Sequence, residues 1–107
     1  MDILKLLDEN KRELVDNKYI LLVTDKESTY DLFIKFLEYY DNMVNSEKDK
    51  TIKFHVGIDF EFNMKEVALM QLNFGKYLWI VDPKHYKDDE KQIINEKLFY
   101  NQKVYKV

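Results

Sequence analysis

The segment Ile52–Asn63, IKFHVGIDFEFN, alternates apolar and polar residues without a break. Alternation with a period of two is typical of a β-strand that buries one face and exposes the other. Asp59 and Glu61 are two positions apart, so they project from the same side, with α-carbons about 6 to 7 Å apart. The segment therefore predicts a sheet that carries two adjacent carboxylates on one face.

Two further strands are predicted directly after this one, at residues 66–74 and 76–83. Gly75 supplies the tight turn between them, and Pro83 ends the last strand. Because a parallel crossover needs about a dozen residues or more, connections this short predict three antiparallel neighbours.

The remaining elements follow from helical and strand periodicity. Thr24 and Glu27 match a capping box at the start of an amphipathic helix over residues 25–43. Phe60 and Phe62, on the apolar face of the central strand, are predicted to pack beneath this helix. The other predictions are a helix at 2–16, a strand at 18–25, a surface loop at 45–51, a helix at 87–99 and a final strand within KVYKV.

The composition indicates one soluble globular domain. Hydrophobic residues make up 46% of the 107 positions and aromatic residues 15%, which is unlike a disordered chain. No apolar run approaches the roughly 20 residues of a membrane helix, and the acidic opening argues against a signal peptide. An intracellular location without membrane contact is therefore expected. The net charge of −3 counts against a module that binds nucleic acid by charge alone, and the absence of cysteine leaves oxygen or imidazole as metal ligands.

Asp59 and Glu61 are the candidate catalytic and metal-binding residues. Two carboxylates this close repel each other unless a cation neutralises them, and hard oxygen ligands favour Mg²⁺ or Mn²⁺. Gly57, on the same face, leaves room for a ligand or marks a bend. The alternative is an ordinary solvent-exposed pair, which is common on antiparallel strands.

Three successive stretches, VGIDFEFN, VALMQLNF and YLWIVDP, occur in an order and spacing that resemble the start of a known domain. The upstream YILLVTDKESTYDLFIKFL and the final KLFYNQKVYKV extend the similarity over residues 18–107. This region resembles the 3′–5′ exonuclease domain of the ribonuclease D and Werner-helicase type, in the DEDD superfamily. The resemblance implies an α/β ribonuclease H-like fold, two-metal hydrolysis of phosphodiester bonds, and a nucleic-acid 3′ end, of DNA or RNA, as the substrate. Asp59 would bridge both ions, and Glu61 would hold one ion and orient the attacking water.

The departure from the family pattern concerns the later motifs. The resemblance implies two further metal-binding aspartates, and Asp82, Asp88 and Asp89 do not match their positions. We therefore expect residues 1–17 to form an N-terminal helix and residues 18–107 to be the N-terminal part of a domain that ends before its later core strands. A C-terminal remainder, a complementary chain or a second copy would complete the sheet. The alternative is a non-catalytic interaction or architectural protein that uses an exposed sheet edge.

Residues beyond the acidic pair include candidate substrate contacts, two histidines and an aromatic strand. Phe62, Asn63 and Met64 follow the acids at the end of the strand and are the candidates for contact with the substrate. His55 lies too far along the strand to share an ion with Asp59, and His85 is expected to be solvated. Three residues on one face of the third predicted strand are expected in the core, namely Tyr77, Trp79 and Val81.

Overall fold

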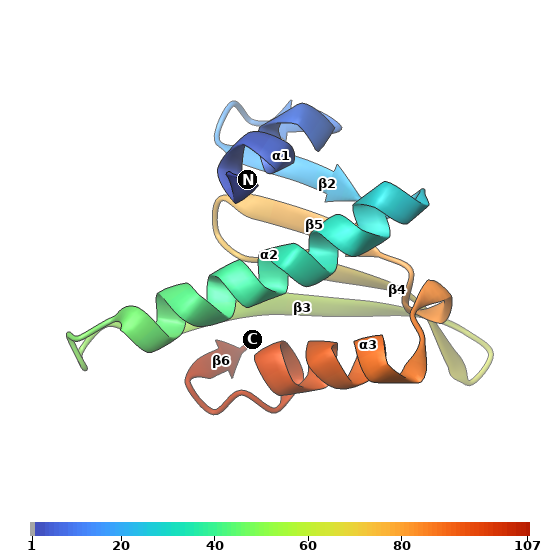
Figure 1. The fold of residues 1–107 in the computed structure, drawn as a ribbon. Helices are drawn as coiled ribbons and strands as arrows, with labels where there is room; N and C mark the ends of the chain where they lie inside the picture. Colours follow the sequence, from blue (N-terminus) through green and yellow to red (C-terminus); the bar gives the residue numbers. More distant parts are fainter. Residues whose placement is uncertain (1) are drawn as a thin grey trace.

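The computed structural model describes residues 2–107 and shows an α/β fold, with helices packed on a mixed six-stranded sheet (Figure 1). The strand order is β1-β2-β5-β4-β3-β6, with bounds β1 (Glu13–Val15), β2 (Tyr19–Val23), β3 (Phe54–Asn63), β4 (Glu66–Asn73), β5 (Tyr77–Val81) and β6 (Val104–Lys106). The helical elements are α1 (Ile3–Asn10), α2 (Glu27–Ser46), the 3₁₀ turn η1 (Pro83–His85), α3 (Asp88–Ile94) and the π-helical turn η2 (Asn95–Phe99).

The strands β3, β4 and β5 form the antiparallel meander that the sequence predicts. Its two tight turns use left-handed backbone angles, with φ of 59° at Met64 and 95° at Gly75. Glycine adopts this conformation without steric cost, because it has no β-carbon. Outside the meander, β2 runs parallel to β5, β6 runs parallel to β3, and β1 pairs antiparallel with β2. The acid-bearing strand β3 therefore lies between β4 and β6.

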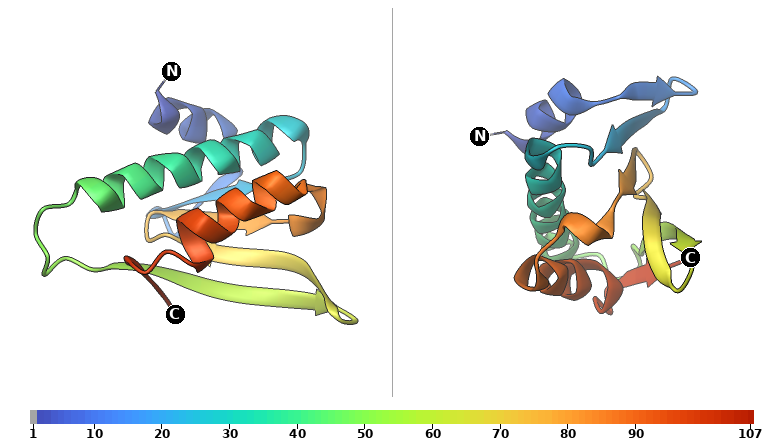
Figure 2. Two further views of the ribbon diagram at one scale, coloured as in Figure 1. Left: turned by 60° about the horizontal axis from the view of Figure 1, so that its bottom comes forward. Right: turned by 90° about the vertical axis from the view of Figure 1, so that its right-hand side faces the viewer.

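The helices α1, α2 and α3 all lie on the same side of the sheet, as the right-hand view of Figure 2 shows. The core between the two layers is aromatic: the rings of Phe33 and Phe36 lie 5.0 Å and 5.6 Å from the ring of Trp79. Val56 and Val81 belong to the same face of the sheet and are fully buried. Burial of each such side chain stabilises the fold by roughly 1.5 to 3 kcal/mol. The core prediction for Trp79 and Val81 is confirmed.

The predicted helix at 2–16 is correct only in its first half. Helix α1 ends at Asn10, and β1 then pairs with β2, with Val15 opposite Tyr19. Asp16 and Asn17 make the reversal with φ of 54° and 57°, a conformation that Asp and Asn tolerate better than most residues. The polar middle of this segment has no apolar face that a helix could bury, and the segment pairs with β2 instead. The residues assigned to an N-terminal helix thus contribute an edge strand.

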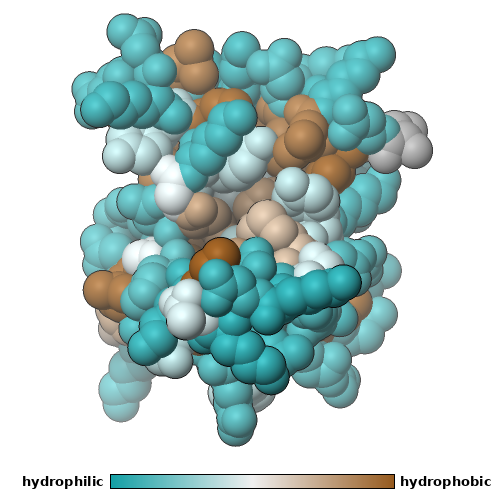
Figure 3. Space-filling model, turned by 90° about the vertical axis from the view of Figure 1, so that its left-hand side faces the viewer, coloured by the Kyte–Doolittle hydropathy of each residue, from teal (hydrophilic) through white to brown (hydrophobic). Residues whose placement is uncertain are grey.

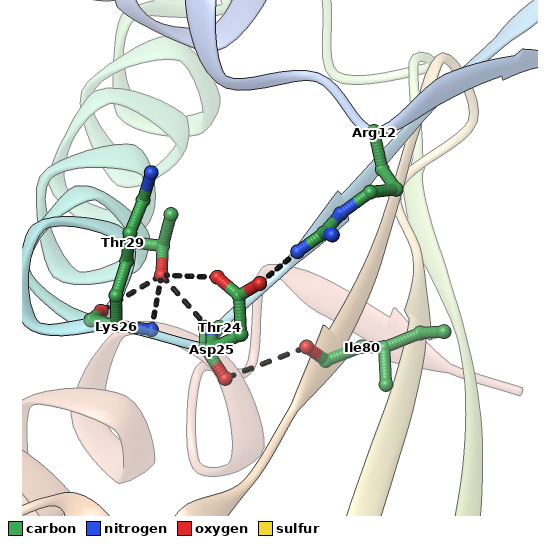
Figure 4. A network of polar contacts seen from close by, with 6 residues as sticks. All are labelled: Arg12, Thr24, Asp25, Lys26, Thr29 and Ile80. Carbon is green, nitrogen blue, oxygen red and sulfur yellow. Dashed lines mark hydrogen bonds and ion pairs between the residues drawn. The ribbon is translucent and has the colours of Figure 1, made fainter.

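The predicted capping box at Thr24 and Glu27 does not form. Instead, Thr29 Oγ1 accepts hydrogen bonds from the backbone amides of Asp25 and Lys26, each at 3.1 Å, and it donates to the Lys26 carbonyl oxygen at 2.8 Å (Figure 4). Thr24 turns toward the sheet, where its hydroxyl accepts from the Asp82 amide at 3.1 Å. Arg12 forms an ion pair with Asp25 (Figure 4). This network joins the end of β2 to the start of α2.

The predicted helix at 87–99 forms, but its last turn is wider than an α-helix. Helix α3 ends at Ile94, and in η2 the Tyr100 amide donates to the Asn95 carbonyl oxygen at 2.7 Å. This five-residue spacing defines a π-helical turn, a form that is rare and often found at functional sites. Asp41 of α2 fixes the turn by accepting from Lys97 Nζ at 3.0 Å.

The end of the molecule seen in Figure 3 is largely hydrophilic. Its larger apolar patches lie in the upper half, at the level of α1 (Figure 3). Leu4 of α1 and Leu14 of β1 are among the large hydrophobic side chains that remain exposed. Within residues 2–107, no helix combines the length and the apolar character needed to cross a bilayer.

Candidate functional site

The helix-free face of the sheet holds the two candidate acids. Along β3, Val56 points into the core, whereas Asp59 and Glu61 point away from the helices and are exposed. Asp59 lines a shallow hollow of about 480 Å³ on this face. Gly57 of the same strand also lines it, and the other strands contribute polar and half-buried apolar residues, namely Leu21, Gln71, Asn73, Leu78 and Ile80.

Gln71, on the neighbouring strand β4, is the polar side chain that contacts the acidic pair. Gln71 is the cross-strand partner of Asp59, and its Nε2 donates to Glu61 Oε1 at 3.1 Å. In residues 2–107, neither carboxylate forms an ion pair with Lys or Arg. One oxygen of Glu61 and both oxygens of Asp59 therefore remain available to a ligand from solvent.

Gly57 and Asn73 shape the floor of the hollow. They pair directly across β3 and β4, and a β-carbon added to Gly57 would lie 3.3 Å from the Asn73 β-carbon. This contact is tight, so glycine permits the close approach of the two strands. The missing side chain also leaves the space beside Asp59 open.

The donor set is suited to a hard divalent ion, but it is small. Asp59 and Glu61 offer water-accessible carboxylate oxygens, the ligand type that Mg²⁺ and Mn²⁺ prefer. Among residues 2–107, no group of three or more His, Cys, Asp or Glu side chains is placed to hold an ion. The pair therefore fits part of a metal site, whose other ligands would come from elsewhere.

The predicted burial of Phe60 and Phe62 beneath α2 is wrong. Phe62 is 63% exposed and Phe60 is 38% exposed, with the Phe60 ring 5.9 Å from that of Phe99. The reason is that the β3–β4 hairpin extends past the helical layer (Figure 1). The pairing of β3 and β4 also shifts between Glu61 and Phe62, which marks a bulge at the base of the tip.

The three candidate substrate residues lie together at this tip. Phe62 and Asn63 end β3, and Met64 follows in the turn, where it is 97% exposed. They project beyond the acids and make no contact with the core. A large apolar side chain in such a place is accessible to a ligand.

The two histidines lie apart from the acids. His55 stacks on Tyr105 of β6, with ring centroids 5.3 Å apart. His85 is exposed, as expected; its ring lies 4.7 Å from that of Tyr30, and its Nε2 lies 3.6 Å from Asp82 Oδ2. Neither histidine lines the hollow beside Asp59.

The residues that the sequence reasoning missed are Gln71 and Asn73. Both are polar positions in the otherwise apolar segment EVALMQLN. Their link to the acids depends on the register of β3 and β4, which the hairpin and its bulge determine.

Comparisons of this chain with protein-family models, with curated proteins and with solved structures found no match. The case for a function therefore rests on the geometry of this sheet. Two carboxylates without a cationic partner project from the helix-free face of β3, and Asp59 lines the hollow there. Any proposal has to explain why the fold places them there.

Proposed function

We propose that this chain is the N-terminal portion of a metal-dependent 3′–5′ exonuclease domain of the DEDD type. The observation that carries the proposal is the position of Asp59 and Glu61, which share the helix-free face of β3 without a cationic partner. The two carboxylates are two positions apart on one face, where like charges repel each other, and a bound cation would relieve this repulsion.

The arrangement of the strands supports this proposal. A ribonuclease H-like exonuclease fold is expected to begin with an antiparallel meander whose first strand carries the acids. Here β3, β4 and β5 are such a meander, and β6 lies parallel to β3 on its other side. The acid-bearing strand is thus internal to the sheet over its first half.

Asp59 and Glu61 would hold the metal ions of this site. When bound, the ions would activate the attacking water and stabilise the leaving oxygen. The role of Gln71 is to hold one oxygen of Glu61, which limits the rotation of that side chain and leaves the other oxygen free. Because two carboxylates are too few ligands, activity would require the further aspartates of a C-terminal remainder or of a complementary chain.

The substrate would be a nucleic-acid 3′ end. Phe62, Asn63 and Met64 would contact it, because Phe62 and Asn63 end β3 just beyond the acids and Met64 follows in the turn. An exposed aromatic ring can stack on any base, which suits an enzyme that removes nucleotides in sequence.

Metal binding by this chain is the direct test. Paramagnetic Mn²⁺ is expected to broaden the backbone amide resonances of Gln71 and Asn73 in a ¹H–¹⁵N spectrum. The double change Asp59→Asn with Glu61→Gln should abolish this broadening. Glu38→Gln, which changes an exposed carboxylate on α2, should leave it intact. Broadening that persists in the double variant would contradict the proposal.

Activity is the second test and needs the completed domain. In an assembly that contains the missing segment, Asp59→Ala is expected to abolish Mn²⁺-dependent release of nucleotides from the 3′ end. Full activity in this variant would remove Asp59 from the catalytic site.

The second candidate is a non-catalytic interaction protein. Leu21, Leu78 and Ile80 favour it, because these apolar side chains are only half-buried on the helix-free face. In this case Leu78→Lys should abolish self-association in sedimentation experiments, and Mn²⁺ should have no effect on the spectrum.

A further inference from the structure

A second concave site lies on the opposite side of β3, between the β3–β4 hairpin and α3. It is a cleft of about 370 Å³ whose wall is mostly apolar. Phe60 and Phe99 form part of this wall, and Tyr100, Lys91 and Asn95 stand beside it. Its volume is within the range of roughly 300 to 1,000 Å³ that is usual for small-molecule sites.

The aromatic side chains of the cleft are accessible from solvent. Tyr100 is 76% exposed and Phe60 is 38% exposed, while Phe99 is half-buried behind Phe60. The π-helical turn brings Phe99 and Tyr100 to this position, since it widens the helix where the cleft opens. The cleft thus offers flat apolar surfaces without a side chain of its own to cover them.

Two polar groups complete the cleft. Lys91 is exposed and, within residues 2–107, makes no ion pair. Asn95 uses its carbonyl oxygen in the π-helical turn, and its side-chain amide makes no hydrogen bond to another described residue. Next to the cleft, Lys84 and Lys91 line a continuation of the same surface together with Glu66, whose Oε2 lies 3.5 Å from Lys84 Nζ.

We infer that this cleft binds one nucleotide of a single-stranded nucleic acid. The base stacks on Phe60 and Tyr100, the Asn95 amide reaches its polar edge, and Lys91 contacts a phosphate. A flat heteroaromatic ring joined to an anion matches the combination of aromatic wall, free amide and unpaired ammonium. The inference rests on the proposed function for the choice of this ligand.

The cleft and the acids lie on opposite sides of the second half of β3. Strand β6 pairs with β3 only from Phe54 to Val56, and the last contact is the Ile58 amide with the Val107 carbonyl oxygen. Beyond Ile58 this edge of β3 has no paired strand among residues 2–107. Phe60 lies between Asp59 and Glu61 in the chain, so the two sites are separated by the thickness of one strand.

The test is oligonucleotide binding in the presence of EDTA, measured as fluorescence anisotropy of a labelled oligothymidylate of about ten nucleotides. Phe60→Ala and Tyr100→Ala are each expected to weaken binding about tenfold. Tyr105→Ala, which removes an exposed aromatic ring on the other face, is the control and should bind normally.

The charge contact has its own test. Lys91→Gln should lower the slope of log affinity against log salt concentration by about 0.7, the value for one phosphate contact on a single strand. Lys35→Gln, which changes an exposed lysine on α2, should leave the slope of log affinity against log salt concentration unchanged. Equal slopes for wild type and Lys91→Gln would remove the phosphate contact and overturn this part of the inference.

Failure of the inference is distinguishable from failure of the proposed function. Without metal, Asp59→Asn with Glu61→Gln should bind the oligonucleotide as wild type does. No oligonucleotide binding, or binding that neither Phe60→Ala nor Tyr100→Ala weakens, overturns the cleft site whatever Mn²⁺ does at the acids. Self-association that Tyr100→Ala relieves, without oligonucleotide binding, would assign the cleft to a protein contact. Because Tyr100 is largely exposed, this variant keeps the test valid even if Phe60→Ala is unstable.

Discussion

The two faces of the sheet are built from the same strands but differ in what covers them. On β5, Trp79 points toward the helices and is 1% exposed, while Leu78 and Ile80 point the other way and remain half-buried. On β3, Val56 is buried, whereas Asp59 lies in open solvent. Alternation divides a strand into two sets of residues, and the helical layer decides which set becomes the core.

The same contrast appears along a single face of β3. Val56 is fully buried, Phe60 is 38% exposed and Phe62 is 63% exposed, although all three belong to the apolar set. Burial therefore follows the reach of the helices and not the hydrophobicity of the side chain. Beyond the part of β3 on which the helices pack, aromatic side chains are exposed and accessible to a ligand.

The largest expected effect is on the covered face. Trp79→Ala should lower the free energy of unfolding by about 3 to 5 kcal/mol, because it opens a cavity between Phe33 and Phe36. Leu78→Ala, one residue away on the helix-free face, should cost about 1 kcal/mol, since its side chain is only half-buried. Urea unfolding followed by circular dichroism measures both. An equal loss of unfolding free energy in the two variants would contradict the difference between the two faces of the sheet.

The next effect is a pH dependence of the covered face. Tyr40 lies on the buried face of α2, and this burial raises its pKa to about 12, from 10.0. The folded state thus keeps the Tyr40 proton after the unfolded chain has lost it, so the stabilisation present below pH 10 is lost as the pH rises toward 12. The difference is on the order of 2 kcal/mol. Tyr40→Phe should flatten this part of the curve of unfolding free energy against pH, and an unchanged slope would contradict the burial of this hydroxyl.

A smaller effect is expected for a buried hydrogen bond on the same side. The Tyr86 hydroxyl donates to the Tyr30 carbonyl oxygen at 3.0 Å, and burial raises the pKa of Tyr86 above its ordinary value. Tyr86→Phe should lower the free energy of unfolding by about 1 kcal/mol, because the acceptor loses its partner. Tyr100→Phe is the matched control on the surface and should have no measurable effect.

The smallest expected effect is at the acids. Asp59→Asn or Glu61→Gln should change the free energy of unfolding by less than about 0.5 kcal/mol, because both side chains are exposed. The sign should be slightly stabilising at low salt, where repulsion between the carboxylates is not screened. A loss of 2 kcal/mol in urea unfolding would show that the pair is structural and would argue against a ligand site.

The predictable parts of this molecule are those that local patterns specify. The meander followed from the alternation in β3 and from connections too short for a crossover. The long helix α2 followed from aromatic residues at helical spacing, although its cap is Thr29 and not the expected pair. The joint projection of Asp59 and Glu61 followed from strand geometry alone.

The parts that were missed depend on long-range contacts. Strand β1 forms because β2 is beside it, and a polar segment read without that partner resembles a helix. Phe62 is exposed because the β3–β4 hairpin extends beyond the helices. The local sequence pattern does not predict how far the helices extend over the sheet. Gln71 reaches Glu61 only in the register that the bulged hairpin produces.

The sequence by itself determined that two carboxylates share one side of a strand, since side-chain alternation is a property of the extended backbone. Only the tertiary structure decided that this side is the one without helices, because the packing of α2 on the other face left Asp59 and Glu61 in solvent. The same packing left Phe60 and Tyr100 beside an open cleft. Local strand geometry thus determined which residues share a face, and the extent of helix packing determined which of them are accessible to a ligand.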